Sequence, residues 1–146
     1  MRTIEFPAVM RAVAVGLGAV ALAGAAQAAG DKSAYESAKA SAKSTYEAAK
    51  ARCDALKDNA KDICQAEAKA NEKVAKKELD YKNKPTEKNR YEADKMKAEA
   101  AYEVAKEKCE DQKGADMVSC KKAAKDEEKR ALAALKSQHK VAKKGS

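Results

Sequence analysis

The chain has 146 residues, a formal net charge of +8, 37% charged residues and only 4% aromatic residues. This length predicts one small domain, and outside alanine, cysteine and tyrosine the mature part has few sizeable apolar residues, so a thin core is expected. Acids and bases alternate along most of the sequence, which is typical of solvated helix faces, so the net charge alone does not identify a partner.

Residues 1–28 have the layout of a secretory signal peptide. Arg2 and Arg11 precede an uncharged run over residues 12–26, and the small residues around Ala28 fit a cleavage site. The run is shorter than the roughly 18 apolar residues that a membrane span needs. We therefore expect cleavage after Ala28, export to the periplasm, and no transmembrane span in the mature protein.

The mature sequence contains an internal duplication. A shift of 56 residues places Tyr46, Cys53, Cys64 and Leu79 on Tyr102, Cys109, Cys120 and Leu135, with many matches between them and no gap. The two copies cover about residues 35–79 and 91–135. A repeated unit of this length predicts two similar structural modules in tandem.

Each copy has the pattern of a helical hairpin. Alanine, lysine and glutamate dominate, and apolar residues recur at intervals of three and four. Pro85 predicts a break between the copies, Asn59 and Asp116 are predicted helix N-caps, and Gly114 is predicted to end the preceding helix. The expected helices are about 32–57, 60–82, 87–113 and 117–138.

These helices predict an all-α fold of two tandem disulfide-stapled helical hairpins, with four helices in a bundle or an extended coiled-coil-like arrangement. The expected organisation is a signal peptide at 1–28, a first hairpin at 29–82, a linker at 83–86, a second hairpin at 87–138 and a basic tail at 139–146.

The four cysteines predict two disulfides, because their number is even and the expected compartment is oxidising. If the chain turns at Asn59 and Gly114, Cys53 pairs with Cys64 and Cys109 with Cys120. If the helices continue through those points, one long hairpin instead pairs Cys53 with Cys120 and Cys64 with Cys109. The turn-forming residues favour the local pairing, but the alternative stays open at this stage.

No pattern in the sequence indicates an enzyme. The spacing between the paired cysteines is too wide for a zinc motif, and His139, the only histidine, lies far from them in sequence. It is expected on the surface, without a second group for acid–base catalysis. The five tyrosines are expected to pack rather than to bind a ligand. We expect no catalytic residue, no cofactor and no metal.

The C-terminal end is basic. After Glu128 there are no acids, and the candidate anion-contacting residues are Lys136, Lys140, Lys143 and Lys144. Such cations interact favourably with the C-terminus of a helix, and they could also touch an anionic envelope surface such as phospholipid, lipopolysaccharide or cell-wall polymer. Nucleic acid is not expected, since an exported protein seldom meets it.

The segment from Asp58 to Cys64, followed by Glu67-Ala68-Lys69, is similar to a repeat found in small exported Ala/Lys-rich proteins of Gram-negative bacteria, often labelled TolA-like or cell-envelope biogenesis proteins. The resemblance implies a periplasmic helical protein. We expect a non-enzymatic structural or interaction role at the cell envelope, with an envelope protein or an anionic envelope polymer as partner. The alternative is a binder of anionic surfaces or ligands through the basic C-terminal end.

Overall fold

A computed structural model describes residues 27–144 of the chain. It contains four helices: α1 (Gln27–Cys53), α2 (Asp58–Asn83), α3 (Glu87–Cys109) and α4 (Gly114–Lys144). There is no strand within this range, so the expected all-α class is confirmed. The predicted signal peptide at 1–28 lies almost entirely outside the described residues.

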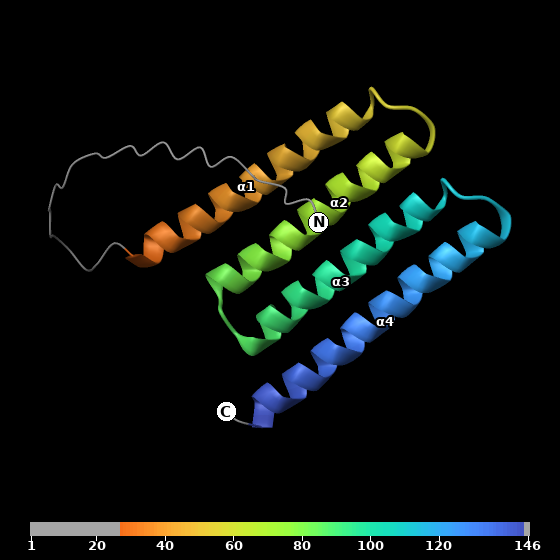
Figure 1. The fold of residues 1–146 in the computed structure, drawn as a ribbon. Helices are drawn as coiled ribbons and strands as arrows, with labels where there is room; N and C mark the ends of the chain where they lie inside the picture. Colours follow the sequence, from red (N-terminus) through yellow and green to blue (C-terminus); the bar gives the residue numbers. More distant parts are fainter. Residues whose placement is uncertain (1–26, 145–146) are drawn as a thin grey trace, which may run out of the picture.

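The four helices lie side by side in one layer, in the order of the sequence and with alternating direction (Figure 1). Within residues 27–144, each helix contacts only the helices that precede and follow it, so α1 does not reach α3 or α4. The sequence left open whether the hairpins form a closed bundle. They form an open layer instead, and its two broad faces are both exposed.

The connection between α2 and α3 is organised by the residues around Pro85. The hydroxyl of Thr86 accepts a hydrogen bond from the backbone N–H of Asn89 at 3.2 Å and caps α3. The side-chain amide of Asn89 donates to the carbonyl oxygen of Lys84 at 2.8 Å. The predicted break at the proline is therefore confirmed.

The other two connections are equivalent turns in the two copies. α2 begins at Asp58 with φ of 50°, and α4 begins at Gly114 with φ of 56°. These positions are 56 residues apart and therefore correspond in the duplication. Gly114 lies at the start of α4 rather than at the end of α3, which corrects the predicted role of this residue.

The predicted N-caps are also corrected. Lys57 occupies the N-cap position of α2 without a side-chain hydrogen bond, and Asp116 lies inside the first turn of α4. The side chain of Asn59 instead donates to the carbonyl oxygen of Glu107 at 3.0 Å and to Oδ1 of Asp111 at 2.8 Å. Asn59 thus joins the first hairpin to the second, a contact that a local cap rule does not consider.

Both disulfides are local. Cys53 pairs with Cys64 and Cys109 with Cys120, with Cα atoms 5.5 and 5.6 Å apart. The pairing favoured by the turn residues is confirmed and the single long hairpin is excluded. Cys53 and Cys109 are fully buried, and each disulfide closes the end of its hairpin beside the turn.

The interface between α2 and α3 is lined by small residues. Ala70, Ala93 and Ala100 are buried there, whereas Ala68 is buried on the side of α2 that faces α1; with Cys53 and Cys109 these alanines make up the buried core of the described part of the chain. Alanine allows close approach of the helices but buries little area, about 0.8 kcal/mol per CH₂-sized group. The layer therefore depends on its cross-links and on helix propensity as well as on burial.

α4 is longer than predicted. It continues to Lys144, whereas the sequence pattern predicted an end near residue 138. The residues assigned to a basic tail, as far as Lys144, are thus part of a helix. Lysines and alanines with high helix propensity continue to the end of that segment and nothing there breaks it.

Candidate functional site

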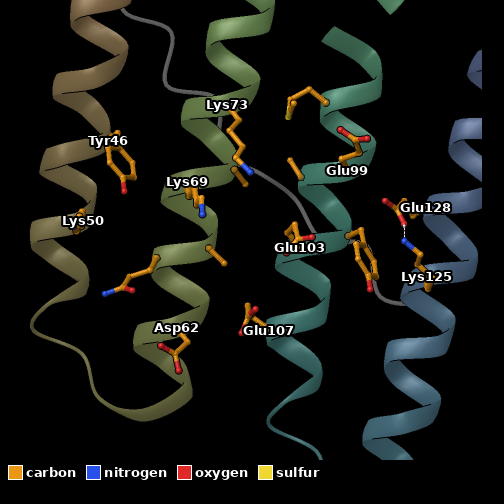
Figure 2. A pocket seen from close by; sticks show the side chains of 16 residues that line it. Tyr46, Lys50, Asp62, Lys69, Lys73, Glu99, Glu103, Glu107, Lys125 and Glu128 are labelled. Carbon is orange, nitrogen blue, oxygen red and sulfur yellow. Dashed lines mark ion pairs between the residues drawn. The ribbon is translucent and has the colours of Figure 1, made fainter. Parts of the chain in front are cut away.

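A groove of about 720 Å³ crosses one broad face of the layer, which we call the groove face. Side chains from all four helices line it (Figure 2). Its floor is formed by small or unbranched residues at the α2–α3 junction, among them Ala66, Ala70, Met96 and Ala100. A groove that is open along one face and lined by all four helices can accept an extended partner or a surface.

The two walls of the groove carry opposite charges. Lys50 on α1 and Lys69 and Lys73 on α2 lie on one side, whereas Glu99, Glu103 and Glu107 on α3 lie on the other (Figure 2). The acids recur every four residues and therefore share one face of α3. Asp62 adds one carboxylate to the first wall.

The acidic wall is largely neutralised by its own helix. Glu99 forms an ion pair with Lys95 at 3.2 Å, and Lys106 lies 3.3 Å from Glu103 and 3.5 Å from Glu107. The hydrogen bond from Lys106 to Glu103 raises the pKa of Lys106, so that lysine stays charged. Lys50, Lys69 and Lys73, in contrast, have no ion-pair partner within 4.0 Å among the described residues. Asp62 has no ion-pair partner in the described residues either, and Lys106 is shared by two glutamates, so the three unpaired lysines leave only a small positive excess around the groove.

Two tyrosines related by the duplication stand in the groove wall. Tyr46 and Tyr102 both line it. Nζ of Lys125 lies 4.5 Å from the centre of the Tyr102 ring and 2.6 Å from the carboxylate of Glu128. The hydrogen bond with Glu128 raises the pKa of Lys125, so this cation is held in place by a ring and an acid whose side chain is only 9% exposed. Both tyrosines are half-buried and contribute to the groove surface.

Outside the groove, the other N-terminal tyrosines of each copy pack between helices. The hydroxyl of Tyr35 on α1 donates to Oδ1 of Asp80 on α2 at 2.5 Å. Tyr91, its counterpart on α3, packs against the ring of His139 with centroids 4.8 Å apart. His139 is thus half-buried against α3 rather than fully on the surface, and the extension of α4 past residue 138 brings it there.

The predicted anion-contacting lysines lie on α4. Lys136, Lys140 and Lys143 are exposed, and none of them has an ion-pair partner within 4.0 Å in residues 32–143. They lie 11, 15 and 18 residues beyond Lys125, which is about three, four and five helical turns. They therefore continue the stripe on α4 that starts with the groove-lining Lys125. Lys144 is the last residue of α4, and its side chain is outside the described part.

The opposite face differs in its charge pairing. Two shallow depressions on it share Asn71 and are lined by α1, α2 and α3. There Lys97 pairs with Glu78 at 3.0 Å and Lys108 pairs with Glu67 at 2.8 Å, both across the α2–α3 junction. These lysines support the interface between the two hairpins instead of presenting free charge.

The groove residues do not stand out in the sequence as a set. The basic wall could have been recognised from Lys69 and Lys73, which are four residues apart and recur as Lys125 and Lys129 in the second copy. The acidic wall appears where the copies differ, since Lys43 and Ala51 correspond to Glu99 and Glu107. That the two walls face each other across α2 and α3 follows only from the tertiary arrangement.

No family model, curated protein or solved structure matches the chain. The resemblance to TolA-like envelope proteins therefore stays a prediction. Within residues 27–144, no helix combines the length and the apolar character that crossing a membrane requires. The same residues contain no cluster of three or more side chains that could hold a metal ion.

Proposed function

We propose that this protein is an exported, non-enzymatic component of the cell envelope that acts by binding another envelope component on its groove face. The observation that carries the proposal is the open layer, in which each described helix contacts only its sequence neighbours. A single layer of helices leaves two broad faces for interaction, and one of them is hollowed and contributed by all four helices.

The two disulfides favour an oxidising compartment as the location of this protein. All four cysteines are paired within the described chain, and structural disulfides form and persist mainly outside the cytoplasm. Together with the signal-peptide pattern of residues 1–28, they favour export to the periplasm. The expected partner is an envelope protein or an anionic envelope polymer.

The test is photo-crosslinking in living cells. A photoreactive residue is placed at Gln65 in the groove, and a matched one at Ala101 on the opposite face. We expect a discrete adduct in the periplasmic fraction from position 65 and little from position 101. Equal amounts of adduct from both positions would contradict the groove as the binding site. Protein found in the cytoplasm with free thiols would contradict export.

A second candidate function is the binding of anionic surfaces through the basic C-terminal end. It is favoured by the exposure of Lys136, Lys140 and Lys143 and by their lack of ion-pair partners within 4.0 Å in the described chain. Cations at the end of a helix also stabilise that helix, so a folding role competes with the binding role.

The salt dependence of retention on anionic vesicles distinguishes the binding role of these lysines from a role in helix stability. If the C-terminal lysines bind an anionic surface, the protein is retained on vesicles that contain phosphatidylglycerol at low ionic strength and released as salt screens the charges. The variant Lys136→Gln, Lys140→Gln, Lys143→Gln should be retained less. If wild-type protein is not retained even at low salt, the second function is wrong.

A further inference from the structure

The groove face carries an excess of exposed lysines without partners. Lys50, Lys69 and Lys73 line the groove, and Lys43 lies seven residues, about two turns, before Lys50 on the same stripe of α1. The stripe of Lys125 on α4 continues through the three exposed lysines of the C-terminal end. We call the following set the lysine face: Lys43, Lys50, Lys69, Lys73, Lys136, Lys140 and Lys143. Each of them is exposed, and none has an ion-pair partner within 4.0 Å in the described chain.

The opposite face lacks such an excess. Two cations that line its depressions, Lys97 and Lys108, are engaged by glutamates across the α2–α3 junction. Arg52 and Lys82 line the other depression without an ion-pair partner in residues 32–143, and both are exposed. The seven unpaired cations of the lysine face therefore outnumber the two that line the opposite depressions.

The spread of the lysine face indicates the shape of its ligand. Its members lie on α1, α2 and α4, and axes of packed helices are separated by about 9 Å, so the outer stripes are about 27 Å apart. A partner helix or a single polymer strand can follow one or two stripes at once. A planar array of anions can meet all three stripes of the open layer simultaneously.

The structure assigns the lysine face to the anionic phospholipid headgroups of a bilayer surface, on which the layer of helices lies flat. This inference rests on the second candidate function and extends it, because it moves the contact from the C-terminal end to the whole groove face. The acidic wall on α3 opposes the contact only in part, since Lys95 pairs with Glu99 and Lys106 is shared by Glu103 and Glu107, which leaves one negative charge of the three.

The experiment compares three double variants of the full chain in vesicle flotation. Lys69→Gln with Lys73→Gln removes charge from the groove, and Lys136→Gln with Lys140→Gln removes it from the C-terminal end. Arg52→Gln with Lys82→Gln removes the same charge from the opposite face. Glutamine keeps helix propensity close to that of lysine, and circular dichroism checks that each variant is folded. The vesicles contain phosphatidylcholine with or without phosphatidylglycerol.

Each lysine close to an anionic surface strengthens binding about fivefold, so a lost pair weakens it about 30-fold. We expect this loss for the groove pair and for the C-terminal pair, and a much smaller loss for the opposite-face pair. On vesicles of phosphatidylcholine alone, no variant should differ from wild type in flotation.

Other results would overturn the inference in different ways. One such result is that the groove variant binds phosphatidylglycerol vesicles as well as the opposite-face variant does, while the C-terminal variant binds less. The assignment of the whole lysine face to the bilayer is then wrong, and binding through the C-terminal end alone is retained. If wild-type protein does not float with phosphatidylglycerol vesicles at low salt, both are wrong. If soluble polyphosphate binds more tightly than vesicles of equal phosphate content, the ligand is a linear polymer and the planar surface is excluded.

Discussion

At the scale of single residues, the two turns closed by disulfides share one backbone conformation but have different residues at that position. The first residue of α2 and the first residue of α4 both have positive φ, and they are Asp58 and Gly114. A Cβ atom disfavours this conformation, although aspartate tolerates it better than most residues. A Cβ added to Gly114 would meet no atom within 4 Å, so the backbone alone decides the effect of a substitution there.

Gly114→Ala should therefore lower the free energy of unfolding by about 1 kcal/mol, through the left-handed backbone conformation. Asp58→Gly is the matched control, and it should leave stability equal to that of wild type or higher, because it relieves the same strain. Chemical denaturation with an unchanged slope measures both. If Gly114→Ala has no effect, the turns are not equivalent.

A second residue-scale prediction concerns the hydroxyl of Tyr35. Its hydrogen bond to Asp80, and the nearby carboxylate charges, raise the pKa of Tyr35 above the ordinary value. Because the folded pKa is raised, the stability that this contact contributes is present below the unfolded pKa of about 10 and is lost as the pH rises beyond it. Asp80→Asn should lower the pKa of Tyr35, as followed by NMR of its ring. An unchanged pKa would show that the contact does not persist in solution.

At the scale of the elements, α1 and α4 are the exposed members of the layer. α1 contacts only α2, and α4 contacts only α3, within the described chain. Each outer helix is joined to its neighbour by a disulfide at the turn. The cross-link restricts the unfolded chain, by about 3 kcal/mol for a short loop. Each outer helix is therefore expected to depend on its own disulfide more than on the other one.

Cys53→Ser with Cys64→Ser should release α1 selectively. We expect faster amide hydrogen exchange in residues of α1 and nearly unchanged protection in α3 and α4, because the second hairpin keeps its own disulfide. Cys109→Ser with Cys120→Ser is the matched control and should release α4 instead. Uniform loss of protection in all four helices would contradict this picture and indicate one cooperative unit.

At the scale of the whole molecule, the duplication raises the question of what keeps the free edges of α1 and α4 from pairing with another molecule. The α2–α3 interface includes Ala70 and Val74 on one side and Ala93 and Ala100 on the other. In the other copy the corresponding residues face outward, at the free edges of α4 and α1, and they are polar: Asp126, Arg130, Ser37 and Ser44. Terminal units of repeat proteins need polar outer faces to stay soluble, and we expect the polar edges of this layer to limit association in the same way.

Replacing the polar residues at both edges should therefore cause association of separate molecules. A variant with Asp126→Ala, Arg130→Val, Ser37→Ala and Ser44→Ala recreates the α2–α3 interface at the free edges. Because the new contact joins α4 of one molecule to α1 of the next, it does not close, and the variant should form chains that grow with concentration. Sedimentation velocity measures this. A variant that stays the size of wild type would show that the edges do not limit the assembly.

The sequence by itself determined the helical class, the four helices, the break at Pro85 and the presence of two similar units, because these depend on local propensity and on a repeat visible in one dimension. It favoured the local disulfides for the same reason, since turn residues such as Gly114 lie between the paired cysteines. It misjudged the helix ends and the role of Asn59, which makes contacts with residues about fifty positions away.

Only the tertiary structure decided that the helices form an open layer and that lysines from three of them share one face. Residues such as Lys50, Lys73 and Lys136 are far apart in the chain, and each looks like an ordinary solvated position on its own helix. Whether separate stripes combine depends on the rotation of each helix about its axis, which is set by packing against its neighbours. Spacing within one helix carries no information about that rotation, and so the groove face could be recognised only once the helices were placed side by side.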